Sequence, residues 1–372
     1  MALSATSPVG VFPANATRIM YRSTSATGDP IAVTGTVLEP PVPWSGPGER
    51  PLVSYAPGTI GVGDQCAHSH LLLDNLIHYA PPFDLIAEAE VGIIDSLLAR
   101  GLAVVVTDYE GLGTASTHPY LNPLSEAPAV IDAARAAQGL TGTSIPAEGS
   151  VAFWGYSQGG GAAGGAAEHA STYAPELKVA GSFVGAPPAD LATLLATLDG
   201  GILTGAIGYF LNGLQQTYPQ TRPVIDRILN DSGRAMLAQV ATQCVPETTL
   251  NFGFHLSNEF TSTGESIPDE LAADPVTRSV LDELRLGNRA PSAPALVAIG
   301  GNDDIVPPAS AMTMIDNWRA GGAAVEVADA TVPAILPSSG IAHVLNAPLS
   351  VATRGIDWLE QQFTQIATFG TN

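Results

Sequence analysis

Two kinds of hydrophobic segment alternate along most of the chain. Short apolar runs rich in β-branched residues predict strands at residues 31–38, 52–55, 102–108, 151–154, 179–184, 295–300 and 324–328. The longer segments between them predict helices at residues 83–100, 125–138, 158–173, 309–320 and 349–363. Several strands, such as 102–106 and 295–299, are apolar at every position, which is typical of strands buried on both faces of a parallel sheet. This alternation of strands and helices predicts an α/β fold with a mostly parallel sheet.

The alternation stops between residues 189 and 288, where no buried strand is predicted. This stretch contains amphipathic pieces separated by Pro, Gly and Asn, at 191–198, 202–214, 223–229, 234–240 and 276–284. A long helical insertion in an α/β protein is most simply a cap. We therefore expect a core formed by residues 1–188 and 289–372, and a helical cap or lid formed by residues 189–288. The glycine-containing apolar segment 200–211 is expected to be a buried cap helix, a mobile flap over an apolar tunnel, or both.

Composition narrows the class of protein. Of the 372 residues, 45% are hydrophobic and 13% are charged, which is typical of a compact globular protein. The formal net charge is −21, and Lys178 is the single lysine beside 13 arginines. Because no basic cluster exists, nucleic acid and anionic membrane surfaces are not expected as partners. No apolar run is long enough to span a membrane, so any lipid contact is expected to be at an interface.

The two cysteines, Cys66 and Cys244, lie far apart in the sequence. In an exported protein they are expected to form a disulfide, whereas in the cytosol they would be two small buried hydrophobic residues. The disulfide is the preferred interpretation. Neither cysteine has the CxxC spacing of a metal site, and no metal is predicted. Residues 1–14 do not resemble an intact signal peptide, so the chain is interpreted as cytosolic or as exported after removal of a signal.

One short motif carries the strongest chemical signal. After the apolar residues 150–153 the chain reads Gly-Tyr-Ser-Gln-Gly at 155–159, and a helix of small residues is predicted next. A strand, Gly-x-Ser-x-Gly and a helix form a nucleophile elbow, in which glycines permit a turn too tight for larger side chains. Glycine is about one residue in ten here (39 of 372), so a glycine-rich turn without function is the alternative. Ser157 is therefore a predicted acyl-transferring nucleophile, provided that its catalytic partners are also found.

A serine nucleophile needs a base and an acid, and on this type of fold the order along the chain is serine, acid, histidine. Of seven histidines, only His255 and His343 follow the serine beyond its own helix, and only His343 leaves room for an acid after a core strand. His343 is expected in a loop just before the C-terminal helix. The acid is expected after the strand at 295–300, where Asp303 is preferred over Asp304 because it fits the spacing Gly-x-x-Asp-x-x-Val-Pro. Asp304 would be a solvated neighbour or a cap for the helix that follows.

A tetrahedral oxyanion needs two backbone N–H donors. One is expected from Gln158, the residue after the nucleophile. The other is expected from the Pro-Gly-Thr loop at 57–59, which follows an early strand. Thr59 is the preferred donor, with Gly58 and Ile60 as alternatives, and an ordinary Pro-Gly turn is the interpretation without function.

The loop after the strand at 102–106 reads Asp-Tyr-Glu-Gly-Leu-Gly at 108–113. It resembles the loop that supports the oxyanion loop in hydrolases, and we expect that role here. Its glycines also resemble a phosphate-binding loop, but no lysine follows them. Neither a nucleotide nor any other cofactor is therefore predicted.

Together these segments resemble the secretory lipase family over most of the chain. The resemblance is carried by Arg-Ile-Met-Tyr-Arg-Ser-Thr at 18–24, Thr-Gly-Thr-Val at 34–37, the segment from Gly58 to Ala67, the motifs at 108–113 and 155–159, and the Asp303 and His343 loops. It implies an α/β-hydrolase core with a helical cap between strands six and seven, and export from the cell. It also implies hydrolysis of carboxylic esters, including acylglycerols, with acyl transfer to alcohols in some members.

Carried onto this chain, the resemblance implies a triad of Ser157, Asp303 and His343, with Thr59 and Gln158 as oxyanion donors. One departure is Cys-Ala-His-Ser at 66–69, where relatives tend to have Cys-Ala-Pro-Ser. We expect this substitution to lie near the mouth of the site and to affect substrate preference.

We therefore predict a secreted serine hydrolase that cleaves small ester or acylglycerol substrates through an acyl-enzyme, without a metal or cofactor. A short-chain esterase, a specialised deacetylase and an acyltransferase are alternatives that would use the same triad. An α/β-hydrolase-fold binding protein without catalysis is a further alternative. The sequence leaves the acyl chain length open, because cap geometry decides it.

Overall fold

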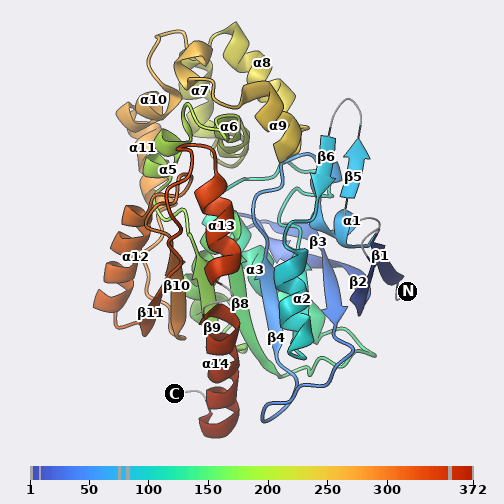
Figure 1. The fold of residues 1–372 in the computed structure, drawn as a ribbon. Helices are drawn as coiled ribbons and strands as arrows, with labels where there is room; N and C mark the ends of the chain where they lie inside the picture. Colours follow the sequence, from blue (N-terminus) through green and yellow to red (C-terminus); the bar gives the residue numbers. More distant parts are fainter. Residues whose placement is uncertain (1–2, 8–9, 74–76, 81–83, 351–353, 371–372) are drawn as a thin grey trace.

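A central β-sheet flanked by helices forms the body of the molecule (Figure 1). The structure is a computed structural model that describes residues 3–7, 10–73, 77–80, 84–350 and 354–370. Within these residues the sheet has nine strands in the order β1-β2-β3-β7-β4-β8-β9-β10-β11. The strands are β1 (Leu3–Ser7), β2 (Gly10–Thr24), β3 (Pro30–Glu39), β4 (Leu52–Ala56), β7 (Ala103–Thr107), β8 (Ser150–Tyr156), β9 (Lys178–Gly185), β10 (Ala295–Ile299) and β11 (Val325–Asp329).

Most of this sheet is parallel. Each neighbouring pair from β7 through β4, β8, β9 and β10 to β11 is parallel, and β1, β2 and β3 extend one edge as antiparallel strands. Strands β4 and β7 are buried at every position. The predicted α/β fold is therefore confirmed. The sequence pattern missed β2, because exposed and buried positions alternate along this strand and leave no continuous apolar run.

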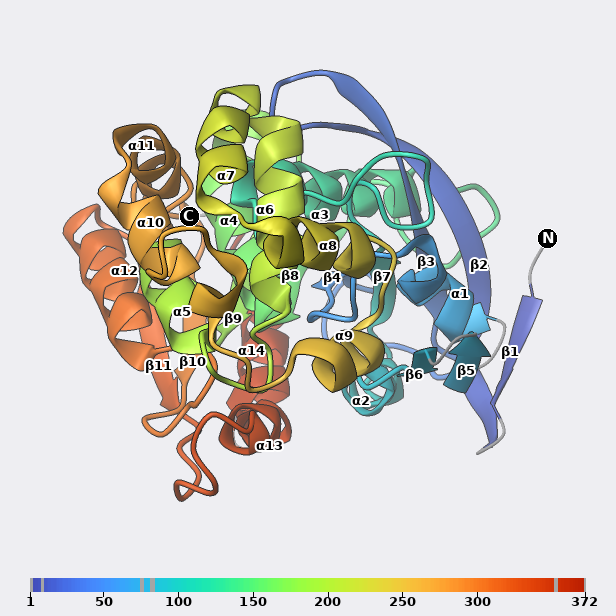
Figure 2. The same ribbon diagram turned by 90° about the horizontal axis from the view of Figure 1, so that it is seen from above.

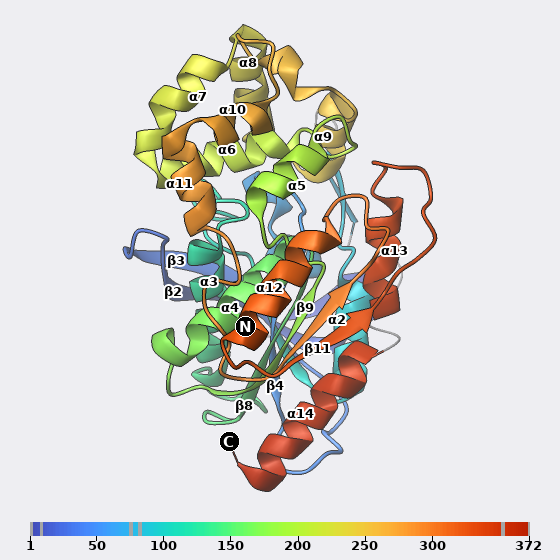
Figure 3. The same ribbon diagram turned by 90° about the vertical axis from the view of Figure 1, so that its left-hand side faces the viewer.

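Helices cover both faces of the sheet. The helices α3 (Pro123–Gln138), α4 (Gln158–Tyr173) and α12 (Pro308–Ala320) share one hydrophobic core with the sheet, and α2 (Val91–Ala99) and α14 (Ile356–Phe369) share the other. Figure 3 shows these two layers on opposite sides of the strands. Neighbouring residues of β8 serve different cores, because side chains alternate along a strand. Phe153 packs against the first group of helices, and Trp154 stacks on Phe183 in the second core.

A group of helices follows β9 and precedes β10 in the sequence. In space it lies beyond the carboxyl ends of the parallel strands (Figures 1 and 2). Its members are α5 (Leu191–Leu198), α6 (Ala206–Thr217), α7 (Arg222–Ile228), α8 (Asp231–Val240), α9 (Val245–Phe252), α10 (Ile267–Ala273) and α11 (Pro275–Glu283). Their apolar side chains form a third core that also includes Tyr156 and Val306 of the main body. Helices α9 and α10, of eight and seven residues, were not predicted.

Two of the predicted helices are wrong in part. Within the range 83–100, residues Asp84–Ala87 form strand β6, which pairs with β5 (Ile77–Ala80), and the helix covers only Val91–Ala99; Phe83 lies outside the described residues. A strand of four residues is too short for its periodicity to be distinguished from a helix. The predicted helix 349–363 falls on two helices, α13 (Ile341–Ser350) and α14, and residues 351–353 lie outside the described part of the chain.

The predicted disulfide between Cys66 and Cys244 is present, with Cα atoms 5.7 Å apart. It joins the turn before α1 (His68–Leu73) to the residue that precedes α9. Beside the disulfide, Gly61 pairs with Cys244 in an isolated β-bridge, and Val245 donates a hydrogen bond to the carbonyl of Ile60. A Cβ on Gly61 would lie 2.4 Å from the Cα of Cys244, so only glycine allows this approach. The loop after β4 is therefore bound directly to the helices between β9 and β10.

Replacing both cysteines by serine is expected to lower the free energy of unfolding by about 2–5 kcal/mol, because the cross-link restricts the unfolded chain. The two cysteines are 178 residues apart, so a large part of the chain is constrained. Urea denaturation followed by tryptophan fluorescence measures the change. Dithiothreitol should destabilise the wild-type protein by a similar amount and leave the double variant unaffected. An equal urea midpoint for the two proteins under oxidising conditions would contradict the prediction.

Candidate active site

Ser157 makes the turn between β8 and α4. Its backbone dihedral angles are φ +60° and ψ −125°, a strained conformation for a residue with a side chain. The two glycines of the motif are required by close backbone contacts. A Cβ on Gly155 would lie 2.0 Å from the carbonyl oxygen of Gly159, and a Cβ on Gly159 would lie 1.9 Å from that of Ala56. The local geometry is therefore that of a nucleophile elbow at the carboxyl end of a central strand.

His343 contacts both Ser157 and Asp303. Its Nε2 lies 2.8 Å from the Oγ of Ser157, and its Nδ1 lies 2.8 Å from Oδ2 of Asp303. Because the Asp303 carboxylate accepts a hydrogen bond from the N–H at Nδ1, the neutral ring carries its proton there and Nε2 can accept a proton from the serine. His343 is the third residue of α13 rather than part of a loop, and Tyr156 holds its backbone carbonyl through a hydroxyl hydrogen bond of 2.7 Å.

The two neighbouring aspartates have different contacts. Oδ1 of Asp303 accepts hydrogen bonds from the N–H groups of Ile305 and Val306, in addition to its contact with the imidazole. Burial raises the pKa of Asp303. The hydrogen bond and charge of His343 and the two N–H donors together lower this pKa by more than burial raises it, so it lies below its usual value. Asp304 instead accepts hydrogen bonds from the N–H groups of Gly340 and His343. Asp304 thus binds the first turn of α13 and not the expected helix α12, and it does not face the imidazole.

Three hydrogen bonds from other segments fix the loop after β4. The N–H of Gly58 donates to Oε1 of Glu90 at 2.9 Å, and the hydroxyl of Tyr109 donates to the carbonyl of Pro57 at 2.8 Å. The hydroxyls of Thr59 and Tyr120 are hydrogen bonded at 2.9 Å. Because Glu90 occupies the N–H of Gly58, this geometry disfavours Gly58 as an oxyanion donor and keeps Thr59 as the better candidate. The predicted support of this loop by the 108–113 segment is confirmed by Tyr109.

Gln158 is the first residue of α4. The N–H groups in the first turn of a helix have no partner within the helix, and they lie at the positive end of the helix dipole. The Gln158 N–H is therefore well placed to bind negative charge that develops beside Ser157. Glu90 and Tyr120, which hold the opposite loop, were not identified from the sequence, because they lie in segments without a recognised motif.

His68, where the chain departs from Cys-Ala-Pro-Ser, does not lie on the surface of the protein. Its side chain is buried and forms an ion pair of 2.7 Å with Glu88, which is also buried. Burial lowers the pKa of His68, but the charge and hydrogen bond of Glu88 raise it more, to about 9. The neighbouring Ser69 N–H donates to Oδ1 of Asp108. The departure from Cys-Ala-Pro-Ser thus places a buried ion pair close to the disulfide, and its effect on substrate preference stays a prediction.

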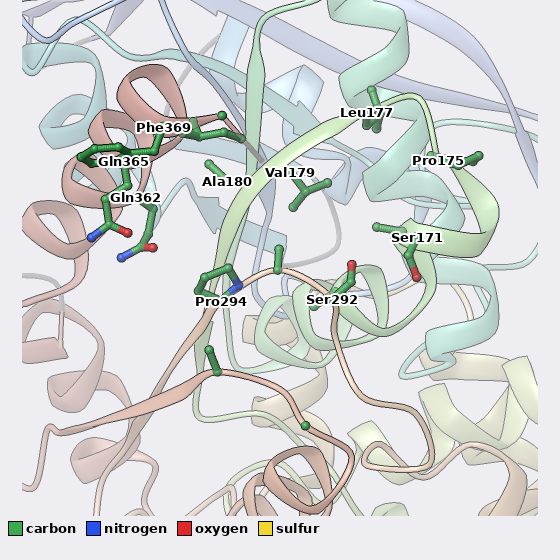
Figure 4. Close-up of a pocket in the computed structure, with 18 residues that line it drawn as sticks. Ser171, Pro175, Leu177, Val179, Ala180, Ser292, Pro294, Gln362, Gln365 and Phe369 are labelled. Carbon is green, nitrogen blue, oxygen red and sulfur yellow. The ribbon is translucent and has the colours of Figure 1, made fainter. Parts of the chain in front are cut away.

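A cavity of about 620 Å³ lies at the other end of the sheet, beside the first residues of β9 and β10 (Figure 4). Its walls include Val179, Pro294, Gln362 and Phe369, so it is remote from the turn at Ser157.

Among the described residues, no cluster of three or more His, Cys, Asp or Glu side chains has the arrangement of a metal site. No helix in the described ranges combines the length and the hydrophobicity needed to cross a bilayer.

The sheet order and the serine elbow define the class of the protein as an α/β-hydrolase. Lipase A of Candida antarctica has the same fold, with a TM-score of 0.72 and 21% identity over 94% of this chain and 88% of that one. The rice cell wall degrading esterase LipA of Xanthomonas oryzae gives a TM-score of 0.75 and 22% identity over 93% of this chain and 91% of its own. The profile of the secretory lipase family matches residues 81–370. The chain belongs to the secretory lipase family.

Two sequences illustrate the range of its relatives. A probable inactive lipase of Mycobacterium tuberculosis is 29% identical over 94% of this chain and 74% of its own length. A secreted triacylglycerol lipase of Malassezia globosa is 27% identical over 83% of this chain and 66% of its own length. The chain therefore spans 74% and 66% of the length of these two relatives. The family confirms the predicted class, carboxylic ester hydrolases, and together with the disulfide it agrees with the predicted export.

Replacing Gly159 by alanine is expected to lower the free energy of unfolding by at least about 3 kcal/mol, because the new Cβ would overlap the backbone of β4. Gly92 is the matched control. It lies in α2, and a Cβ there would have no atom within 4 Å. Gly92→Ala is expected to raise the free energy of unfolding by about 0.5–1 kcal/mol. Urea denaturation measures both changes, and a Gly159→Ala variant as stable as the wild type would contradict the proposed reason for this glycine.

Proposed function

We propose that the chain hydrolyses carboxylic esters, with Ser157 as nucleophile, His343 as base and Asp303 as the acid that orients the base. The main support is the unbroken set of hydrogen bonds from the Oγ of Ser157 through the imidazole to Asp303, with both contacts at 2.8 Å. Geometry of this kind activates a serine hydroxyl that is otherwise a weak nucleophile. The family and the order of the three residues along the chain agree with this assignment.

In the first half of the reaction, Nε2 of His343 takes the hydroxyl proton while the Oγ of Ser157 forms a bond to the ester carbonyl carbon. The C–O bond to the alcohol then breaks, and the alcohol leaves with the proton from Nε2. In the second half, water gives a proton to Nε2 of His343 while its oxygen bonds to the acyl carbon. The C–O bond to Ser157 then breaks, and Nε2 returns the proton to the Oγ as the acid leaves. Asp303 stays anionic throughout and stabilises the imidazolium, in agreement with its lowered pKa.

The N–H groups of Gln158 and Thr59 are proposed to bind the oxyanion. The first lies at the N-terminus of α4, and the second lies on the loop held by Tyr109, Glu90 and Tyr120. Donors that are fixed before the reaction stabilise the developing charge without having to move. The contacts behind this loop therefore support a preformed hole.

Residues 189–288 are proposed to act as a cap on a core formed by residues 1–188 and 289–372. The cap helices pack on the site side of the sheet, and Tyr209 of α6 meets Tyr120 edge to face, with ring centroids 5.6 Å apart. The apolar core of these helices extends to Tyr156, next to the nucleophile. This environment favours the acyl part of an ester. The relative from Malassezia is named as a triacylglycerol lipase, so an acylglycerol is the substrate class that we propose.

Ser157→Ala is expected to abolish hydrolysis of p-nitrophenyl butyrate and labelling by a fluorophosphonate, because both reactions need the serine oxygen. The substitution is small and leaves the elbow glycines in place, so the urea midpoint should stay close to that of the wild type. A relative named as a probable inactive lipase makes a binding protein without catalysis the second candidate. That candidate would be favoured if the folded wild-type protein neither hydrolysed the ester nor reacted with the label.

Asp303→Asn is expected to lower kcat by about a thousandfold or more, because an amide can stabilise the wrong tautomer of His343 and provides no charge to the imidazolium. Asp304→Asn is the matched control, since among the described residues the hydrogen bonds of the Asp304 carboxylate come from the N–H groups of Gly340 and His343 and from the hydroxyl of Ser339. Its kcat should fall by less than about tenfold. Steady-state kinetics with the same ester measure both variants. Equal losses in the two variants would contradict the assignment of the acid to Asp303.

A further inference from the structure

The side chain of Gln158 extends into a buried polar group that takes no part in the proton transfers described above. Its Nε2 lies 2.7 Å from Oε1 of Glu126 on α3 and 2.9 Å from Nε2 of His118. Gln158, Glu126 and His118 are 3%, 1% and 1% exposed. Burying three polar side chains is costly unless their hydrogen bonds are satisfied, so this arrangement requires an explanation.

The backbone carbonyl of Glu110 determines which atoms donate in the hydrogen bonds that join His118, Gln158 and Glu126. Nδ1 of His118 lies 2.7 Å from the backbone oxygen of Glu110, which can only accept. The ring therefore carries its proton on Nδ1, and its Nε2 accepts from the amide of Gln158. Burial lowers the pKa of His118 to about 4, which agrees with a neutral ring. The second proton of the amide goes to Glu126, whose Oε1 also accepts from the N–H of Leu121.

The loop of residues 109–122, which contains His118, also contacts the other side of the proposed oxyanion hole. The ring of His118 is stacked on Tyr109 and meets Tyr120 edge to face. Tyr109 holds the carbonyl of Pro57, and Tyr120 holds the hydroxyl of Thr59. Residues 109–122 therefore touch both segments that carry the proposed oxyanion donors.

We propose that Glu126 and His118 are positioning residues for the oxyanion hole, acting through the side chain of Gln158. The two hydrogen bonds fix the Gln158 residue at the N-terminus of α4 and so direct its backbone N–H toward the reacting carbonyl oxygen. This inference rests on the proposed ester hydrolysis. It adds that the orientation of the Gln158 backbone N–H depends on the Gln158 side chain, which is hydrogen bonded to Glu126 on α3 and to His118 in the 109–122 loop.

The charge of Glu126 is part of this arrangement. A small cavity beside it is lined otherwise by apolar residues or glycine, namely Leu121, Pro123, Gly161, Pro188, Leu284 and Leu286. Burial raises the pKa of Glu126 to about 8, despite its hydrogen bonds from Gln158 and Leu121. Of the titratable groups that face it, His118 is neutral, and burial keeps the pKa of Tyr109 and of Tyr120 well above the usual value. Glu126 is therefore neutral at pH 7 and becomes an anion as the pH rises through about 8.

The test compares Glu126→Leu, which removes the acceptor, with Glu126→Gln, which keeps a carbonyl oxygen in its place. With p-nitrophenyl butyrate, Glu126→Leu should lower kcat about 30-fold and leave KM within about twofold, because a displaced donor affects mainly the transition state. Glu126→Gln should stay within about threefold of the wild type. His118→Phe keeps the aromatic stack but loses Nε2, and its kcat should fall about fivefold to tenfold. Fluorophosphonate titration gives the concentration of competent sites for each variant.

A pH profile provides a second measurement that does not depend on the folding of Glu126→Leu. In the wild type, kcat/KM should fall as the pH rises above about 8, because the Glu126 anion repels the developing oxyanion. In Glu126→Gln, which cannot ionise, the plateau should extend to higher pH. Identical alkaline limbs in the two proteins, or a folded Glu126→Leu variant with unchanged kcat, would overturn the positioning role.

Ser157→Ala separates this inference from the function on which it rests. If Ser157→Ala retains wild-type hydrolysis, the proposed function fails and the positioning role fails with it. If Ser157→Ala is inactive while the Glu126 variants keep the wild-type kcat and alkaline limb, only the positioning role is overturned.

Discussion

Ser157 can make its turn only because β8, α4 and β4 approach one another at distances that exclude any side chain. The glycines on either side of the serine face backbone carbonyls, one in α4 and one in β4, and each approach would be blocked by a single methyl group. This contact sets the position of α4 on the sheet and the direction of the serine side chain. The strain at Ser157 is tolerated because the surrounding sheet and helices are packed tightly enough to maintain it.

The remaining site residues are placed by separate segments that meet at this turn. His343 lies at the start of a helix whose first turn is bound by Asp304, and its carbonyl is held by the residue that precedes the serine. Asp303 is supported by the N–H groups of its own loop. The loop after β4 depends on Glu90, Tyr109 and Tyr120, which come from two other parts of the chain. His343 and the loop after β4 are thus each oriented by contacts outside their own segments, whereas Asp303 is supported from within its loop.

Sequence patterns were sufficient for the features that depend on local constraints. The continuous apolar runs identified the parallel strands, and the glycine spacing identified the turn at Ser157. The order of acid and base along the chain selected His343, and the spacing Gly-x-x-Asp-x-x-Val-Pro selected Asp303 over Asp304; the structure places Asp303 and His343 in contact. The supporting residues could not be predicted in this way, because Glu90, His118 and Glu126 have no recognisable spacing and meet only through tertiary packing. The short strand β6 and the antiparallel strand β2 were missed for a related reason, since neither produces a long apolar signal.

The bond between Cys66 and Cys244 restricts how the helices that follow β9 in the sequence can move relative to the loop after β4. The cross-link, the bridge from Gly61 and the hydrogen bond from Val245 to Ile60 all attach the start of α9 to the loop next to Thr59. Moving this end of the helical group would therefore also displace the loop that carries Thr59. A movement of these helices that leaves the loop in place has to leave the start of α9 in place too, so we expect the largest displacement at the helices remote from α9.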